Sequence, residues 1–117
     1  MFRYIRISLT LQIPENTNKG IAPIMIPNNA VPVWHIFAVR TKKRDELAAY
    51  LAEKGISTNK HYPIPMHLQD CYKDLEIPQG ALPIAEEISA TQLSLPMFYG
   101  MTDDQIQFVI DSINQYR

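Results

Sequence analysis

The chain has 117 residues and a formal net charge of -1, with acidic and basic residues interleaved. This length suits one domain, and the mixed charge argues against a nucleic-acid-binding surface or a face attracted to membranes. No apolar run approaches the roughly 20 residues that span a bilayer, and the single cysteine cannot form an internal disulfide. Because no basic segment followed by an apolar run opens the chain, we expect a cytoplasmic protein.

Residues 1–30 carry the weakest pattern in the chain. Apolar and β-branched residues alternate in part over 1–12, which favours a strand or a sheet-edge segment. Residues 13–29 are rich in Pro, Asn and Gly and predict irregular chain. We therefore divide the sequence into a poorly defined amino-terminal segment, 1–30, and a folded domain, 31–117.

Residues 31–40, VPVWHIFAVR, are apolar on both alternating faces and predict a strand that is buried on both sides. Val33, Phe37 and Val39 share one face of this strand. His35 lies on the same face, and we interpret it as a core histidine that is hydrogen-bonded to the backbone.

A helix is predicted between Thr41 and Gly55. Thr41 is expected to cap its start, and Gly55 is expected to end it in the left-handed conformation, with Ile56 folding back on Leu51. The apolar residues that recur at three- and four-residue spacing, and so form one stripe, are Leu47, Ala48, Leu51 and Ala52.

Short elements follow this helix. Residues 56–59 are interpreted as a brief strand or an extended lead, and residues 69–75 as a turn of helix. Pro83 occupies the first position of a helix of about ten residues, with Ile84, Ala85, Ile88 and Thr91 on one face. Residues 93–95 predict a short strand.

The last helix has the strongest signals. Thr102 and Gln105 form a capping box, and Met101 and Ile106 occupy the positions of a hydrophobic staple. The residues that continue its apolar stripe are Ile106, Val109, Ile110 and Ile113. The complete order predicts an α/β or α+β layer in which about three helices cover a small sheet of three or four strands.

The segment 60–72, KHYPIPMHLQDCY, is the candidate site. It holds two histidines, two tyrosines, two prolines and the only cysteine. Pro63 and Pro65 remove backbone donors and favour extended chain before them, so the segment is stiff. A stiff loop that carries imidazoles and phenols is suited to position a ligand. The alternative is a proline-rich connector whose aromatic side chains cap the core.

Other chemistry is conceivable for the same residues. Zinc is one alternative, with His35, His61, His67 and Cys71 as its four ligands, although their spacing matches no compact zinc-finger pattern. A nucleophilic Cys71 activated by His67 is another, but no orienting carboxylate or oxyanion hole is evident. We therefore predict neither a metal site nor a catalytic residue.

Four stretches together resemble one protein family. The succession VWHIFAVR, RDELAAYLAEKGIST, HYPIPMHLQ and LPIAEEISATQLSLPMFYGMTDDQIQFVIDSI, within 31–117, resembles the carboxy-terminal small domain of the DegT/StrS family of sugar aminotransferases. The resemblance implies a pyridoxal-phosphate enzyme of the aspartate aminotransferase fold. Such enzymes move an amino group from glutamate onto a keto sugar carried by a nucleotide, commonly for cell-surface polysaccharides.

The resemblance also implies a role for the loop. It places HYPIPMH near the mouth of the active site, which makes His61, Tyr62 and His67 candidate substrate contacts. An imidazole and a phenol can hydrogen-bond sugar hydroxyls or diphosphate oxygens, and a protonated histidine adds charge assistance. Intact members of the family pair as dimers, so a homodimer is implied as well.

In that family a large amino-terminal domain supplies the aldimine lysine, the partner of the pyridine nitrogen and most of the phosphate site. Nothing in this sequence corresponds to that domain, and Lys60, beside a proline loop, offers no phosphate site. We therefore expect no cofactor on this chain alone. Two hypotheses remain: a small domain that is inactive without the missing part, or a free-standing module that binds a nucleotide sugar or a protein partner.

Overall fold

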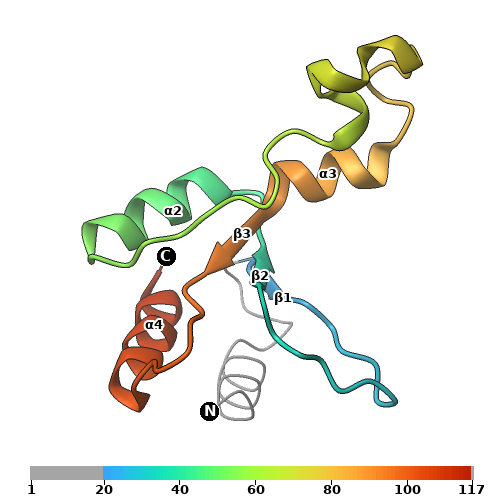
Figure 1. Ribbon diagram of the computed structural model, residues 1–117. Coiled ribbons are helices and arrows are strands. Elements are labelled where there is room, and N and C mark those ends of the chain that lie inside the picture. Colours follow the sequence, from blue (N-terminus) through green and yellow to red (C-terminus); the bar gives the residue numbers. More distant parts are fainter. Residues whose placement is uncertain (1–19, 117) are drawn as a thin grey trace.

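The computed structural model describes residues 20–116 (Figure 1). The strand predicted over 1–12 lies outside these residues. In chain order the elements are the strands β1 (Ala22–Pro23) and β2 (Phe37–Arg40), the helix α2 (Arg44–Glu53), the 3-10 helices η1 (Met66–Leu68) and η2 (Asp70–Leu75), the helix α3 (Pro83–Thr91), the strand β3 (Gln92–Leu95) and the helix α4 (Asp103–Gln115).

The three strands form one antiparallel sheet in the order β1-β2-β3. Ala22 lies opposite Arg40, and Phe37 lies opposite Leu95. Because side chains alternate along a strand, Phe37 and Leu95 share the apolar face with Val39 and Leu93. The opposite face is largely polar. This sheet and its covering helices confirm the predicted fold class.

Helices α2 and α4 cover the apolar face of the sheet, and both lie on the same side of it in Figure 1. The Tyr50 hydroxyl of α2 donates a hydrogen bond of 3.1 Å to the Ser112 carbonyl of α4, and the Tyr50 and Tyr116 rings lie 5.1 Å apart. Ile21, just before β1, joins the same core, so residues 21–23 belong to the sheet layer. The helical side chains of the core are Leu47, Leu51, Ile106, Val109, Ile110 and Ile113.

The two ends of α2 differ in how well the sequence predicts them. At the end of the helix, Gly55 has a φ of 78°, and the Ile56 N–H donates to the Leu51 carbonyl at 2.9 Å. This geometry confirms the predicted ending. The predicted start is wrong, because the helix begins at Arg44 with Lys43 at the cap position. The Thr41 hydroxyl instead accepts from the Lys43 N–H at 3.2 Å, within a turn that precedes the helix.

The strand predicted over 31–40 is confirmed only for its last four residues. β3 pairs with residues 37–40 alone and β1 with residues 39–40, so the described sheet gives residues 31–36 no paired strand. Val33 is 96% exposed and His35 is exposed. The prediction that His35 is a core histidine is therefore wrong, because apolar neighbours in sequence do not bury a segment that has no packing partner.

Residues 62–88 form an arm that projects from the sheet layer, with η1 and η2 packed beside α3 (Figure 1). Pro83 opens α3 as predicted. The predicted apolar face of this helix is not buried, since Ile84 is 74% and Ile88 41% exposed. Two hydrogen bonds tie the base of the arm to the body: Arg40 Nη2 to Glu87 Oε1 at 2.9 Å, and Arg44 Nη1 to the Ser89 carbonyl at 2.7 Å.

The predicted capping box at the start of α4 is confirmed. The Gln105 N–H donates to Thr102 Oγ1 at 3.2 Å, and the Thr102 N–H donates to Gln105 Oε1 at 3.0 Å. Met101 and Ile106, at the staple positions, are both buried in the core. The helix therefore begins at a fixed residue and presents its apolar stripe to the sheet.

Replacing Thr102 with alanine removes the side chain that accepts the Gln105 N–H. We expect the free energy of unfolding to fall by about 1 kcal/mol, the usual loss for such a cap. Urea unfolding followed by circular dichroism measures the change, with Ser57→Ala, at an exposed loop position, as the control. Equal midpoints for the two variants would contradict a stabilising cap.

Candidate functional site

His61 lies over the polar face of the sheet and is held from three sides. Its backbone N–H donates to Gln92 Oε1 at 3.0 Å, and its ring Nδ1 lies 2.9 Å from Ser94 Oγ. Its ring Nε2 lies 3.3 Å from Asn59 Nδ2. Gln92 and Ser94 are buried, and Gln92 Nε2 donates to Ser94 Oγ at 2.7 Å. The ring of His61 therefore has a fixed orientation.

The chain before His61 explains this placement. Asn59 and Ser94 form an isolated antiparallel bridge, with N–H to carbonyl distances of 3.1 and 2.8 Å. The short strand predicted over 56–59 is thus reduced to one bridge on the free edge of β3. The bridge sets the register that brings His61 next to Gln92 and Ser94.

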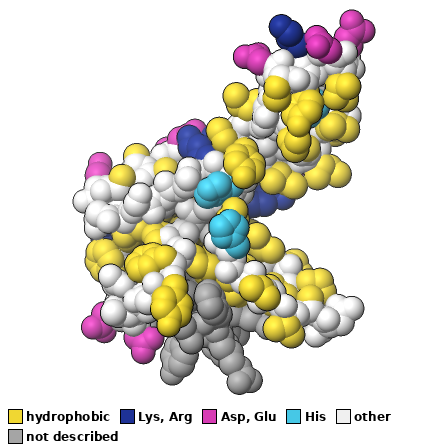
Figure 2. Space-filling view, viewed as in Figure 1, with side chains coloured by type: hydrophobic (Ala, Val, Ile, Leu, Met, Phe, Trp, Pro, Cys, Tyr) yellow, Lys and Arg dark blue, Asp and Glu magenta, His cyan; other side chains and the backbone are white. Residues whose placement is uncertain are grey.

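A polar cavity of about 220 Å³ opens beside this network, and we call it the His61 cavity. It brings His61 together with His35, which the sequence had assigned to the core. Figure 2 shows histidine side chains gathered near the centre of this face of the molecule. The cavity is lined by His35, Ile36, Ser57, Thr58, Asn59, His61, Ser94, Leu95, Pro96 and Met97.

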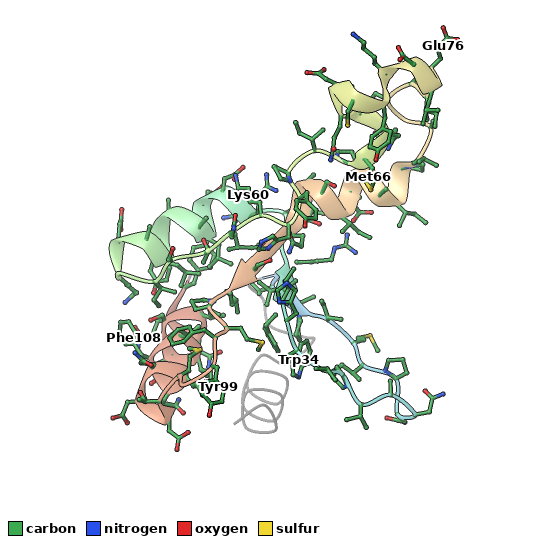
Figure 3. All side chains as sticks on the ribbon, viewed as in Figure 1. Trp34, Lys60, Met66, Glu76, Tyr99 and Phe108 are labelled. Carbon is green, nitrogen blue, oxygen red and sulfur yellow. The ribbon has the colours of Figure 1, made fainter. Side chains whose placement is uncertain are left out.

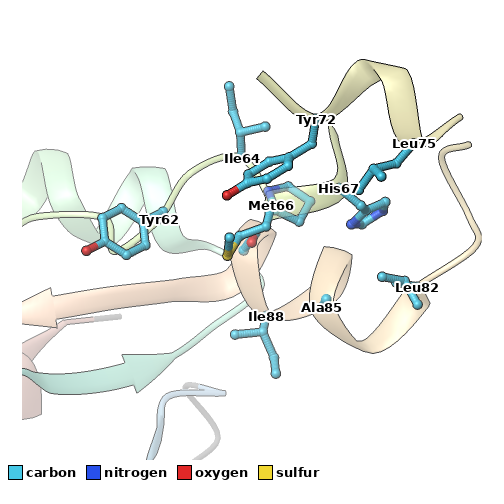
Figure 4. A pocket seen from close by; sticks show the side chains of 11 residues that line it. Tyr62, Ile64, Met66, His67, Tyr72, Leu75, Leu82, Ala85 and Ile88 are labelled. Carbon is cyan, nitrogen blue, oxygen red and sulfur yellow. The ribbon is translucent and has the colours of Figure 1, made fainter. Parts of the chain in front are cut away.

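Tyr62 faces a different cavity. Its ring is 67% exposed and meets the His61 ring edge-on at 5.6 Å between centroids. It stands at one end of an apolar groove of about 500 Å³ between η1, η2 and α3, the arm groove (Figure 4). The groove is lined by Tyr62, Ile64, Pro65, Met66, His67, Tyr72, Leu75, Leu82, Ala85, Ile88 and Ser89.

His67 is buried within the arm, with 8% of its surface exposed. Its Nε2 lies 3.0 Å from Glu86 Oε1, and the same carboxylate accepts the backbone N–H groups of Gly80 at 2.8 Å and Leu82 at 3.3 Å. His67 and Tyr62 line the arm groove, whereas His61 lines the other cavity. A contact between His67 and substrate stays a prediction.

The pKa of the Glu86 carboxyl is lowered by its hydrogen-bond partners in the arm. Burial by itself raises its pKa, but hydrogen bonds from the Gly80 N–H, the His67 ring and the Leu82 N–H outweigh this effect and hold the pKa below its usual value of 4.5. Hydrogen bonds to the charged form of a carboxyl favour that form. Because the folded-state pKa is depressed, the stabilisation is present above the unfolded value and is lost as the pH falls through the folded value.

Glu86→Gln tests this pairing. At neutral pH we expect the variant to have the lower melting temperature, because it loses the charged acceptor. Between about pH 5 and pH 3 the melting temperature of the wild type should fall more steeply, so that the gap narrows. Thermal scans across this range measure the slopes, with the exposed Glu53→Gln as the control. Parallel curves for the wild type and Glu86→Gln would show that Glu86 is not linked to folding.

Lys60 is directed to α2 and not into either cavity. Lys60 is labelled beside α2 in Figure 3, and its Nζ lies 2.6 Å from Asp45 Oδ1. Hydrogen bonds from Lys60 and then Arg44 lower the pKa of the Asp45 carboxyl against the smaller opposing effect of burial. Lys60 therefore holds the segment against the start of α2.

The two chemical alternatives find no matching geometry. The Cys71 thiol is exposed and lies 3.9 Å from Gln69 Oε1, while His67 faces Glu86. His35 and His61 share a cavity that contains neither of the other two. Within residues 20–116, no three His, Cys, Asp or Glu side chains come close enough to hold a metal ion.

Pyridoxal phosphate does not fit the lining of the His61 cavity. The cofactor needs a lysine for its Schiff base, a charged partner for the ring nitrogen and donors for the phosphate. The lining of the His61 cavity contains no Lys, Arg, Asp or Glu. The Lys60 ammonium, the nearest candidate in sequence, is bound to Asp45. The His61 cavity therefore offers polar contacts for a ligand, but its lining holds no lysine or other charged side chain that could anchor this cofactor.

Comparison with known proteins shows the relationship. Residues 9–114 match the DegT/DnrJ/EryC1/StrS aminotransferase family. The chain belongs to this family. The region that matches the family starts at residue 9, whereas the resemblance noted in the sequence starts at residue 31. The family match therefore includes part of the weakly patterned segment 1–30.

Two relatives come from Streptomyces venezuelae. The first is a dTDP-3-amino-3,4,6-trideoxy-alpha-D-glucose transaminase, 42% identical over 94 residues, which cover 80% of this chain and 24% of the relative. The second is the crystal structure of DesV in complex with a ketimine intermediate, 34% identical with a TM-score of 0.83, covering 97% of this chain and 29% of that one. The DegT-family chain spans about a quarter of the length of the relatives it matches.

A third relative shares the fold at lower identity. The protein Spr1654 of Streptococcus pneumoniae, solved in PLP and PMP forms, is 22% identical with a TM-score of 0.77 and is covered over 28% of its length in the PMP form. Among the described residues of the DegT-family chain, no helix has the length and apolar character needed to cross a membrane.

The polar partners of His61 were missed from the sequence. Asn59, Gln92 and Ser94 were not singled out, although QLSL alternates polar and apolar residues over 92–95. That alternation is typical of a strand with one polar face. It could have indicated Gln92 and Ser94 as a pair directed away from the core.

Proposed function

We propose that residues 31–117 are the carboxy-terminal small domain of a cytoplasmic nucleotide-sugar aminotransferase, and that the chain is inactive without the part that carries the cofactor lysine. Family membership over 9–114 supports the reaction class. The observation that carries the proposal is the His61 cavity, which presents fixed polar groups but no anchor for the cofactor. A cavity with polar groups but no cofactor anchor suits a domain that encloses the substrate while another domain binds the cofactor.

The exposed apolar surface also supports a missing neighbour. Val31 is 88% exposed, Val33 96%, Met25 78% and Tyr99 91%. Surfaces of this kind mark contacts with another domain or subunit. We propose that the rest of the enzyme covers them, either within the same polypeptide or from a second copy in a homodimer.

The proposed substrate is a keto sugar carried by a nucleotide diphosphate, since the name of the S. venezuelae transaminase gives a dTDP-linked amino sugar. His61 and Tyr62 are the proposed contacts, since the His61 ring faces a polar cavity and the Tyr62 ring is exposed beside it. His67 is proposed as the third, although Glu86 occupies its Nε2. Through that bond His67 also fixes the arm on which Tyr62 stands.

A chimera tests the proposal. The S. venezuelae transaminase would receive this chain in place of its own matching 94-residue segment. We expect the chimera to bind pyridoxal phosphate and to transaminate the sugar nucleotide of its parent, and His61→Ala to reduce its kcat/KM. The control is Asn29→Ala, at an exposed position outside the cavity.

A folded chimera that binds the cofactor but shows no turnover would contradict the proposal. Titration of the 117-residue chain alone with thymidine-diphosphate glucose distinguishes the hypothesis of a free-standing module from that of an inactive small domain. We expect a flat response to millimolar concentration, because the isolated domain forms only one wall of the site. Saturable binding by the chain alone would favour the module.

A further inference from the structure

We propose that His61 is held as the neutral tautomer with its hydrogen on Nδ1. Its unprotonated Nε2 then accepts a hydrogen bond from a sugar hydroxyl and does not contact the diphosphate. The identity of the ligand rests on the proposed function. The tautomer does not, because it follows from the hydrogen bonds of this chain.

Asn59 determines that the Nε2 atom of His61 carries no hydrogen. The Lys60 backbone N–H can only donate. It lies 2.8 Å from Asn59 Oδ1, which fixes this atom as the amide oxygen. The other amide atom, Nδ2, is therefore the NH₂ group, and it lies 3.3 Å from His61 Nε2. An NH₂ group donates and does not accept, so Nε2 must present its lone pair.

Gln92 and Ser94 allow the Nδ1 atom of His61 to carry the hydrogen. The His61 backbone N–H donates to Gln92 Oε1, so Gln92 Nε2 is the NH₂ group that donates to Ser94 Oγ at 2.7 Å. The Ser94 oxygen has a second lone pair, and it lies 2.9 Å from His61 Nδ1. It can accept a hydrogen from Nδ1, which is the tautomer that Asn59 requires. The other tautomer would set the Nε2 hydrogen against the Asn59 NH₂ group.

The tautomer restricts what His61 can bind. A phosphate oxygen of a nucleotide diphosphate only accepts, and so it has no hydrogen to offer a bare Nε2. A sugar hydroxyl has one. The lining of the His61 cavity, which contains no Lys or Arg, also lacks the cations that commonly bind a diphosphate. The contact between Asn59 Nδ2 and His61 Nε2 is long, at 3.3 Å, so a ligand hydroxyl can replace it at small cost.

Nitrogen NMR of the imidazole ring in the 117-residue chain tests the tautomer. In a spectrum recorded at about pH 8.5, we expect the His61 Nδ1 to carry the hydrogen. Asn59→Asp keeps an oxygen for the Lys60 N–H and replaces the NH₂ group by a second oxygen, so the hydrogen should move to Nε2. Asn29→Asp adds the same charge at an exposed position and should not move it.

A wild-type His61 with its hydrogen on Nε2 would overturn the proposal. So would an Asn59→Asp variant that keeps the hydrogen on Nδ1, because Asn59 would then not set the tautomer. Each of these results is independent of whether any nucleotide sugar binds.

Binding to the chimera tests the substrate contact. We expect His61→Ala to weaken the binding of thymidine-diphosphate glucose by about 5- to 10-fold, which corresponds to the loss of one hydrogen bond. The affinity for thymidine diphosphate should change by less than about 2-fold. Equal losses for the two ligands would place the contact on the diphosphate and overturn the proposal. If the unmodified chimera binds neither ligand, the proposed function fails, and the tautomer measurement alone decides this inference.

Discussion

Replacing Phe37 with alanine is expected to lower the free energy of unfolding by about 4 kcal/mol. The Phe37 side chain is 2% exposed at the start of β2, and its ring centroid lies 4.9 Å from that of Trp34. It contributes to the single core between the sheet and the helices α2 and α4. Removal of the ring leaves a cavity that neighbouring side chains fill only in part. Since small domains have a total stability of about 5–15 kcal/mol, the variant should be close to unfolded.

The matched control is Phe98→Ala, which removes the same side chain from a position that is 53% exposed. We expect a loss below about 1 kcal/mol there. Urea unfolding followed by tryptophan fluorescence reports directly on the Phe37 site, because Trp34 is the only tryptophan. Similar losses for the two variants would mean that the core is not organised around β2.

Replacing Gln92 with leucine is expected to cost about 2 kcal/mol. The volume changes little, but the His61 backbone N–H loses its acceptor and the buried Ser94 hydroxyl loses one of its two partners. The loss follows mainly from the part-buried His61 N–H group, which is left without its acceptor. The same change removes one of the three supports of His61, so the amide and ring resonances of this residue should broaden or shift.

Gln79→Leu, at an exposed position on the arm, is the control and should be nearly neutral. Denaturant unfolding measures the stability and NMR the His61 resonances. A Gln92→Leu variant with wild-type stability and unchanged His61 resonances would show that the network does not position the ring.

The features that the sequence predicts well depend on residues within one turn of each other. The Thr102–Gln105 capping box and the ending at Gly55 each involve only a few consecutive residues, and both are confirmed. Pro83 opens α3 for the same reason, since it needs only its own fixed φ. Local hydrogen bonds of this kind leave a local pattern.

The predictions that are wrong concern features that depend on residues far away in the sequence. Residues 31–36 have the composition of a buried strand, but in the described sheet neither β1 nor β3 extends to them. His35 is exposed for this reason and lies in the His61 cavity. The apolar face of α3 is exposed in the same manner. A sequence pattern predicts that such a side chain needs a partner but not whether the same chain supplies it.

The substrate contacts proposed for His61, Tyr62 and His67 stay predictions, and the structure gives only the surroundings of these residues. The segment 60–72 was singled out from its composition, and His61 and Tyr62 do border cavities. The sequence could not indicate that Gln92 and Ser94, far along the chain, orient the His61 ring. Nor could it separate His61 from His67, because a proline-containing segment that bends away from the sheet gives neighbouring histidines different surroundings.

The most direct test of the central claim is to map where pyridoxal phosphate attaches. The 117-residue chain would be incubated with the cofactor and reduced with borohydride, and its peptides would be analysed by mass spectrometry. The account predicts no lysine labelled in one-to-one stoichiometry, because this chain supplies the substrate side of the site. Stoichiometric label at one lysine, Lys60 included, together with the absorbance of an aldimine, would contradict it.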